Sequence, residues 1–162
     1  MVPALFRRLK LPMGENMTFV QKLVRLHLRP IALSKEVSDS AIRRLLFEAG
    51  NDGAELMKLC RADITSKNPD KVGKFLKNFE RVEQKMAEVE ERDRVRNFQP
   101  PITGDEIIKL FNLAPGPVIG EIKEQIKDAI LDGVIRNDRE EAYRLLMEIA
   151  QKKGLVKPEL NP

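Results

Sequence analysis

The stretch Asn97–Asp138 decides the fold of the second half of the chain, because two proline-containing breaks divide it. Its first part reads Asn-Phe-Gln-Pro-Pro-Ile-Thr-Gly-Asp-Glu (97–106), and its middle reads Leu-Ala-Pro-Gly-Pro-Val-Ile-Gly (113–120). Proline has no amide proton and clashes with the preceding helical turn, so Pro100-Pro101 must close the element before it. Thr103 with Glu106 three residues later is the pattern of a capping box, which begins a helix. Pro115-Gly116-Pro117 then forces a second turn, and another amphipathic helix follows.

This second turn is also a candidate anion-binding site. It leaves uncommitted backbone N–H groups at a helix N-terminus, and such groups attract phosphates. Lys109, Lys123 and Lys127 would add positive charge to the same surface. Gly116 has no side chain that would hold a phosphate away, but a glycine could equally serve only to permit the turn. The sequence supports both interpretations.

Outward from this stretch, the spacing of apolar residues predicts further helices. Steps of three and four residues predict helices over 17–29, 39–49, 53–66, 70–96, 103–112, 117–132 and 138–153. Pro30 is expected to stop the first of these. Ser38 or Asp39 is expected to cap the second, with Gly50 just past its end. Gly and Pro cluster between the periodic segments and only 5% of residues are aromatic, so the sequence predicts an all-α fold.

The segment 70–96 contains no proline and one glycine, Gly73. Roughly 27 residues at about 1.5 Å each would make a helix of about 40 Å. We interpret the alternating charges between Glu80 and Arg94 as a solvated face with i,i+4 ion pairs. The segment is expected to act as a strut that links two helical clusters.

Composition bounds the class of protein. The 162 residues are 42% hydrophobic and 33% charged, which suits a small globular chain with an ion-rich surface. A single cysteine, Cys60, excludes an internal disulfide and favours a reducing cytoplasm. A run of about 18 apolar residues is lacking, so no membrane span is expected. Arg7, Arg8 and Lys10 interrupt what would be the apolar core of a signal peptide.

Positive charge is concentrated at the start of the chain. Residues 1–34 have six basic side chains and one acidic one, whereas the whole chain has a net charge of +4. A basic end suggests an anionic partner, of which nucleic acid is the commonest. The alternatives are a solvated surface and a face that docks on an acidic protein domain.

Several motifs together resemble the C-terminal part of the tRNA nucleotidyltransferase (CCA-adding) and poly(A) polymerase family. In the second half they are Pro100-Pro101-Ile102-Thr103-Gly104, Pro115-Gly116-Pro117-Val118-Ile119-Gly120 and Ala129-Ile130-Leu131-Asp132-Gly133. In the first half they are Leu26-His27-Leu28-Arg29-Pro30, Asp39-Ser40-Ala41-Ile42-Arg43-Arg44-Leu45 and Ala62-Asp63-Ile64-Thr65-Ser66-Lys67-Asn68, which look like the HD-type body of the same family. The resemblance covers nearly the whole chain in the correct order.

The resemblance implies a division into an HD-type body remnant (1–68), a long linking helix (69–99) and a C-terminal helical tail module (100–162). In that family an N-terminal head adds nucleotides from CTP and ATP with Mg²⁺, and this chain lacks the head. We therefore expect no catalytic residue, no cofactor and no nucleotide addition by this chain alone. Its expected role is to position tRNA or another structured RNA for the head.

His27 and Asp63 match late metal-ligand positions of HD-type phosphohydrolases, by the same resemblance. Two ligands cannot make that site, because such ions need several converging donors. His27, the only histidine, is otherwise expected to be structural, with one ring nitrogen bonded locally. Asp63 could instead fasten two helices by pairing with Arg43 or Arg44. Cys60 is interpreted as a core residue.

The candidate RNA-binding residues are basic side chains with one glycine. Phosphate and shape would be read, with little base recognition. The set is Arg7, Arg8, Lys10, Arg29, Arg43, Arg44, Lys67, Gly116 and Lys123. Two alternatives stay open: an HD-type metal-dependent phosphohydrolase fragment whose other ligands come from another chain, and a helical protein-interaction module.

Overall fold

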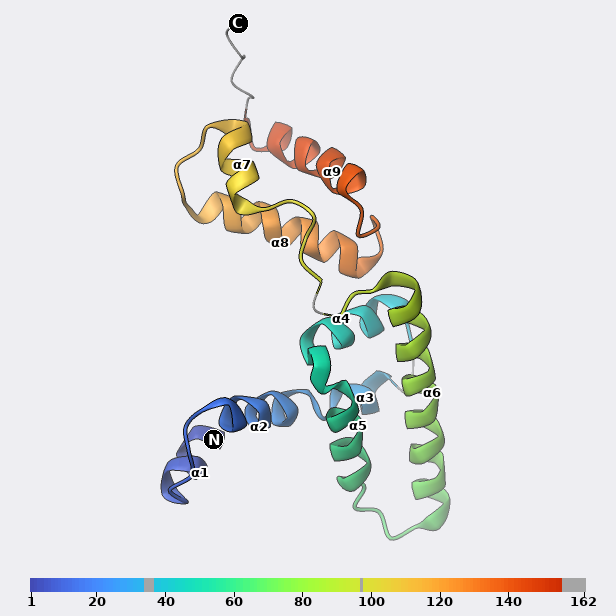
Figure 1. The fold of residues 1–162 in the computed structure, drawn as a ribbon. Coiled ribbons are helices and arrows are strands. Elements are labelled where there is room, and N and C mark those ends of the chain that lie inside the picture. The colour runs from blue at the N-terminus through green and yellow to red at the C-terminus, as the bar shows by residue number, and fades with distance from the viewer. Residues whose placement is uncertain (34–36, 97, 156–162) are drawn as a thin grey trace, which may run out of the picture. The chain divides into compact units, whose positions relative to one another are not determined.

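The computed structural model of the chain describes residues 1–33, 37–96 and 98–155, and all regular elements in these ranges are helices (Figure 1). The all-α prediction is thus confirmed. Two compact units divide the chain, Met1–Asn97 and Phe98–Pro162. Asn97, where the deciding stretch begins, and residues 156–162 of the expected tail module lie outside the described residues.

The first unit is built around α6. Its helices are α1 (Val2–Arg8), α2 (Glu15–Leu26), α3 (Arg29–Leu33), α4 (Asp39–Ala49), α5 (Gly53–Ala62) and α6 (Pro69–Asp93), with a short 3₁₀ turn η1 (Gly50–Asp52) before α5. Helices α3, α4 and α5 all pack on α6, and α1 packs on α2 (Figure 1). Fully buried side chains form the core of this unit: Leu26, Ile42, Leu45, Leu46, Leu56, Met57, Cys60, Phe79 and Val82.

Helix α6 is therefore a packed member of the first unit, where the sequence had suggested a strut between clusters. Its buried side chains lie in its second half: Phe79, Val82, Met86 and Val89. Its first half has exposed apolar side chains, Phe75 and Leu76. The helix ends at Asp93 because Arg94 adopts a left-handed conformation, with φ of 48°.

Ion pairs join α4 to α6. Nε of Arg43 donates to Oδ2 of Asp93 at 2.8 Å, and its side chain is only 14% exposed. Asp39 at the start of α4 accepts from Arg92 at 2.7 Å and pairs with Lys85 at 3.1 Å. Hydrogen bonds from Arg92, and then from Lys85, hold the pKa of the Asp39 carboxyl below its usual value. The two helices are thus tied together near the C-terminal end of α6.

Several boundaries in the first unit differ from the prediction. Pro30, expected to stop a helix, lies inside the first turn of α3, where a missing amide proton is tolerated. Helix α1 was not predicted at all. By contrast, α4 spans 39–49 as predicted, with Oγ of Ser38 accepting from the amide of Ala41 at 3.3 Å. Gly50 follows it with φ of 56°.

The second unit consists of α7 (Gly104–Phe111), α8 (Pro117–Asp132) and α9 (Arg139–Lys152). Helices α7 and α9 both pack on α8. The capping box is confirmed: Thr103 accepts from the amide of Glu106 at 3.2 Å, and the Glu106 carboxylate accepts from the amide of Thr103 at 2.8 Å. Buried side chains form a second, separate core: Ile107, Phe111, Ile122, Ile126, Ile130, Leu146 and Ala150.

Candidate nucleic-acid interface

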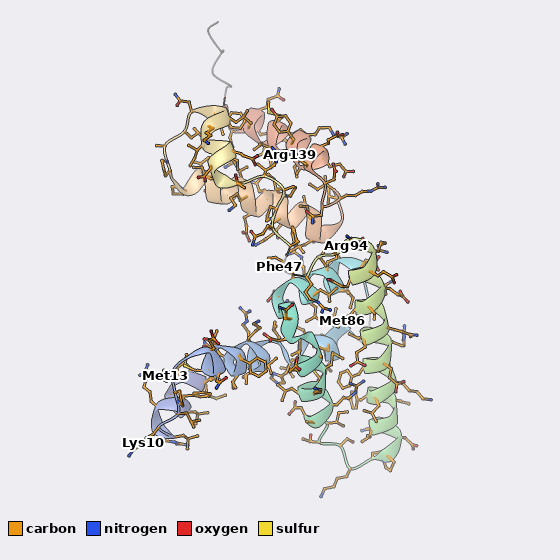
Figure 2. All side chains as sticks on the ribbon, viewed as in Figure 1. Lys10, Met13, Phe47, Met86, Arg94 and Arg139 are labelled. Carbon is orange, nitrogen blue, oxygen red and sulfur yellow. The ribbon has the colours of Figure 1, made fainter. Side chains whose placement is uncertain are left out.

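Three of the predicted RNA-binding residues lie at the α1–α2 hairpin. Arg7 and Arg8 occupy the last turn of α1, and Lys10 lies in the loop that follows, with φ of 53°. All three side chains are exposed, and within the part of the chain that the structure describes they form no ion pair. Figure 2 shows Lys10 and Met13 together at the loop end of the hairpin. Their charges are therefore available to an anionic partner.

Other predicted residues are engaged within the first unit. Arg29 forms an ion pair with Glu48, whose other oxygen lies 3.7 Å from Arg25. Arg43 is held by Asp93, and Arg44 is half-buried on the same helix. The predicted pairing of Arg43 with Asp63 was wrong, because the carboxylate that binds Arg43 is that of Asp93 on α6. Arg43 holds α4 against α6, and its largely buried side chain offers little surface to a phosphate.

Lys67 is exposed in the loop between α5 and α6 and forms no ion pair with any described residue. It is followed on α6 by three exposed cations that were not among the predicted residues, Lys71, Lys74 and Lys77. Arg81, predicted only as part of a solvated charged face, comes one turn later. Their spacing of three and four residues was the available signal.

His27 and Asp63 do come together. Nδ1 of His27 donates to the carbonyl of Val24 at 2.6 Å, which confirms the expected local bond, and Nε2 lies 3.9 Å from Oδ2 of Asp63. Among the described residues, no further His, Cys, Asp or Glu joins them to form a group of three potential metal ligands. The described donor set does not fit an HD-type metal site, so no hydrolytic step is derived from it.

Cys60 lies beside this pair and is part of the core. It is fully buried, and its Sγ donates to the carbonyl of His27 at 3.1 Å. Burial raises the pKa of the thiol to about 11, so the thiolate that a nucleophile requires is disfavoured. A cavity of about 240 Å³ lies next to it, lined by Ile31, Cys60, Asp63, Ile64, Phe75 and Phe79 among others.

Gly116 caps the N-terminus of α8 in an extended conformation, with φ of −175°. Any residue adopts this conformation, and a Cβ added there would come no closer than 3.8 Å to its nearest neighbour, the carbonyl oxygen of Ala114. Neither the backbone nor the packing therefore requires glycine. No side chain caps this end of α8. Lys123 is exposed one to two turns further on, whereas Lys127 is paired with Glu124.

A larger cavity of about 350 Å³ lies on the second unit. Three charged side chains line it, those of Glu106, Lys109 and Arg139. The remaining lining residues are three apolar ones and one tyrosine: Ile102, Leu110, Leu146 and Tyr143. Arg139, labelled on α9 in Figure 2, donates to Glu106 at 2.6 Å and to the carbonyl of Pro101 at 3.0 Å. The Arg139 guanidinium, followed by the amide of Thr103, lowers the pKa of Glu106. Arg139 thus holds the start of α9 against the start of α7.

The two units differ in charge. Residues 1–97 contain 20 basic and 14 acidic side chains, whereas residues 98–162 contain 9 basic and 11 acidic ones. An anionic partner is therefore attracted mainly by the first unit.

Comparison with known proteins adds no assignment, since no family model, curated protein or solved structure matches the chain. None of the helices in the described ranges is long and apolar enough to cross a membrane.

Proposed function

We propose that this chain is an RNA-binding segment of the tRNA nucleotidyltransferase and poly(A) polymerase type, which holds structured RNA for a catalytic head. The proposal rests on the resemblance of its motifs to that family. The observation that supports RNA contact is the excess of positive charge on residues 1–97. Four exposed cations add to it that form no ion pair with any described residue: Arg7, Arg8, Lys10 and Lys67.

In this proposal the chain positions the RNA and takes no part in making or breaking covalent bonds. Rigid helices present cations to phosphate oxygens, and the N-terminus of α8, where Gly116 provides no side-chain cap, offers a second contact. The Mg²⁺ and nucleotides of the parent reaction belong to the head. A reducing cytoplasm is the compartment that suits both a free Cys60 and an RNA partner.

The test compares tRNA, a minihelix of the acceptor and TΨC arms, and a tRNA of altered base sequence but the same shape. All three should bind within a few-fold of one another, because they share a stacked backbone. Lys123→Glu should weaken binding to each, while Arg144→Glu, which removes another exposed cation, on α9, should have a smaller effect. A strong dependence on base sequence at constant shape would overturn shape-directed recognition.

Gly116→Ala isolates the contact at the N-terminus of α8. The substitution fits without a clash, so the thermal midpoint should not fall, while a phosphate approaching the amides would meet the new methyl group. Binding weakened at unchanged stability supports this contact. Unchanged binding removes α8 from the interface.

One observation favours a second candidate function, docking on another protein domain. The α1–α2 hairpin exposes Leu9 (61%), Leu11 (44%) and Met13 (45%), and Leu28, in the turn between α2 and α3, is 59% exposed. RNA phosphates need no such apolar surface, whereas a protein partner would bury it. Leu9→Ser with Leu11→Ser should then abolish capture of that partner while RNA affinity stays unchanged.

A further inference from the structure

Five cations gather at the first half of α6 and in the loop before it. They are Lys67, in the loop before the helix, and Lys71, Lys74, Lys77 and Arg81 on the helix, here called the α6 basic stripe. Side chains three and four residues apart lie on one side of a helix. From Lys71 to Arg81 the stripe extends about 15 Å at about 1.5 Å per residue. All five side chains are exposed.

The stripe differs from the rest of α6 in having no ion partners. Within the described ranges, none of its five cations forms an ion pair, although Asp70 and Glu80 lie nearby in sequence. In the second half of the helix, Lys85 and Arg92 are both held by Asp39. The cations of the second half hold α4 against α6, whereas those of the first half bind no other described helix.

The stripe is held in place by the start of α6. Oδ1 of Asn68 accepts from the amides of Asp70 and Lys71 at 2.9 and 3.2 Å, and Pro69 occupies the first turn. A capped helix fixes the spacing of its side chains before a ligand arrives, so less ordering accompanies binding.

We propose that the α6 basic stripe is the main phosphate-binding surface of this chain and lies along the backbone of a structured RNA. The inference rests on the proposed function and specifies its surface. Lysine and arginine pair with phosphates and with carboxylates alike, so an acidic protein is the alternative occupant of the stripe. The proposed RNA-positioning role of the chain favours RNA.

The experiment compares two triple variants with equal loss of charge. The stripe variant is Lys71→Gln with Lys74→Gln and Lys77→Gln. The control is Arg136→Gln with Arg144→Gln and Lys152→Gln, three exposed cations of the second unit without ion pairs to described residues. Affinity for tRNA is measured from about 50 to 200 mM salt, and circular dichroism checks that both variants keep their helices.

The stripe variant should lower the slope of log affinity against log salt by about 2 to 3, at about 0.7–0.9 per lost contact. The control should change it by less than 1. If both triples change the slope equally, the stripe proposal fails while RNA binding stands. If the unsubstituted protein binds no tRNA, the proposed function fails and the stripe proposal with it. Loss of polyglutamate binding with unchanged tRNA binding would assign the stripe to an acidic protein and overturn the proposal.

Discussion

Asp93 shows how one residue connects distant parts of the first unit. Its carboxylate accepts from Arg92 and from Arg43, each at 2.8 Å. These hydrogen bonds, first that of Arg92 and then that of Arg43, lower the pKa of Asp93 to about 2. The ionised carboxylate is therefore favoured in the folded state, and its loss would leave the largely buried Arg43 without its partner.

We predict that Asp93→Asn weakens the first unit and its acid response. The folded pKa of about 2 lies below the ordinary 3.8, so Asp93 stabilises the fold above pH 4 and this stabilisation is lost as pH falls from about 4 to 2. Asp93→Asn should reduce the free energy of unfolding by about 2 kcal/mol at pH 7 and flatten its decline below pH 4. Native-state hydrogen exchange of α4 amides measures both effects.

Glu91→Gln is the matched control, because Glu91 is an exposed acid on the same helix that forms no ion pair with any described residue. It should change neither quantity appreciably. Equal effects of the two substitutions would show that the Asp93 contacts contribute nothing beyond general charge.

At the residue scale, the sequence predicted the local surroundings of a side chain better than its ion-pair partner far away in the chain. The local bond of His27 and the burial of Cys60 follow from their neighbours in sequence and were predicted. The pairing of Arg43 with Asp93 spans 50 residues, and nothing in a single sequence specifies which of several carboxylates an arginine will meet.

At the scale of the element, helix ends were predictable where a capping residue or glycine marks them. Ser38, Gly50 and Thr103 placed the ends of α4 and the start of α7 to within one residue. Helix α5 was predicted to reach residue 66 but ends at Ala62. The prediction was too long because the segment up to Asn68 contains no helix-stopping residue that could locate the end of the helix. The packing of α6 on α3, α4 and α5 could not be inferred, since an apolar helix face predicts burial but does not specify which helices cover it.

Two substitutions in the second unit should act in opposite directions. Thr103→Ala removes the side chain that begins α7 and should lower stability by about 1 kcal/mol. Gly120→Ala lies inside α8, where an added Cβ meets nothing within 4 Å, and should raise stability by about 0.5–1 kcal/mol. Hydrogen exchange of α8 amides reads out both. A stabilising Thr103→Ala would contradict the capping box as a determinant of the fold.

For the whole molecule, the two units have separate cores and opposite charge balance. The sequence showed the basic N-terminal segment, but the excess on residues 1–97 and the acidic balance of residues 98–162 became visible only when the structure divided the chain there. This division moves the expected RNA contact toward the first unit. The RNA-positioning account therefore depends on long-range attraction by that unit.

The affinity for tRNA as a function of salt, measured with heparin as a competing polyanion, tests the RNA-positioning account most directly. We predict binding near 10⁻⁵ M at about physiological salt, with log affinity falling linearly in log salt by about 0.7–0.9 per phosphate contact. tRNA should compete better than heparin at equal charge, because its shape is recognised as well. Absence of binding at low salt, or binding no stronger than that of heparin, would contradict an RNA-positioning role.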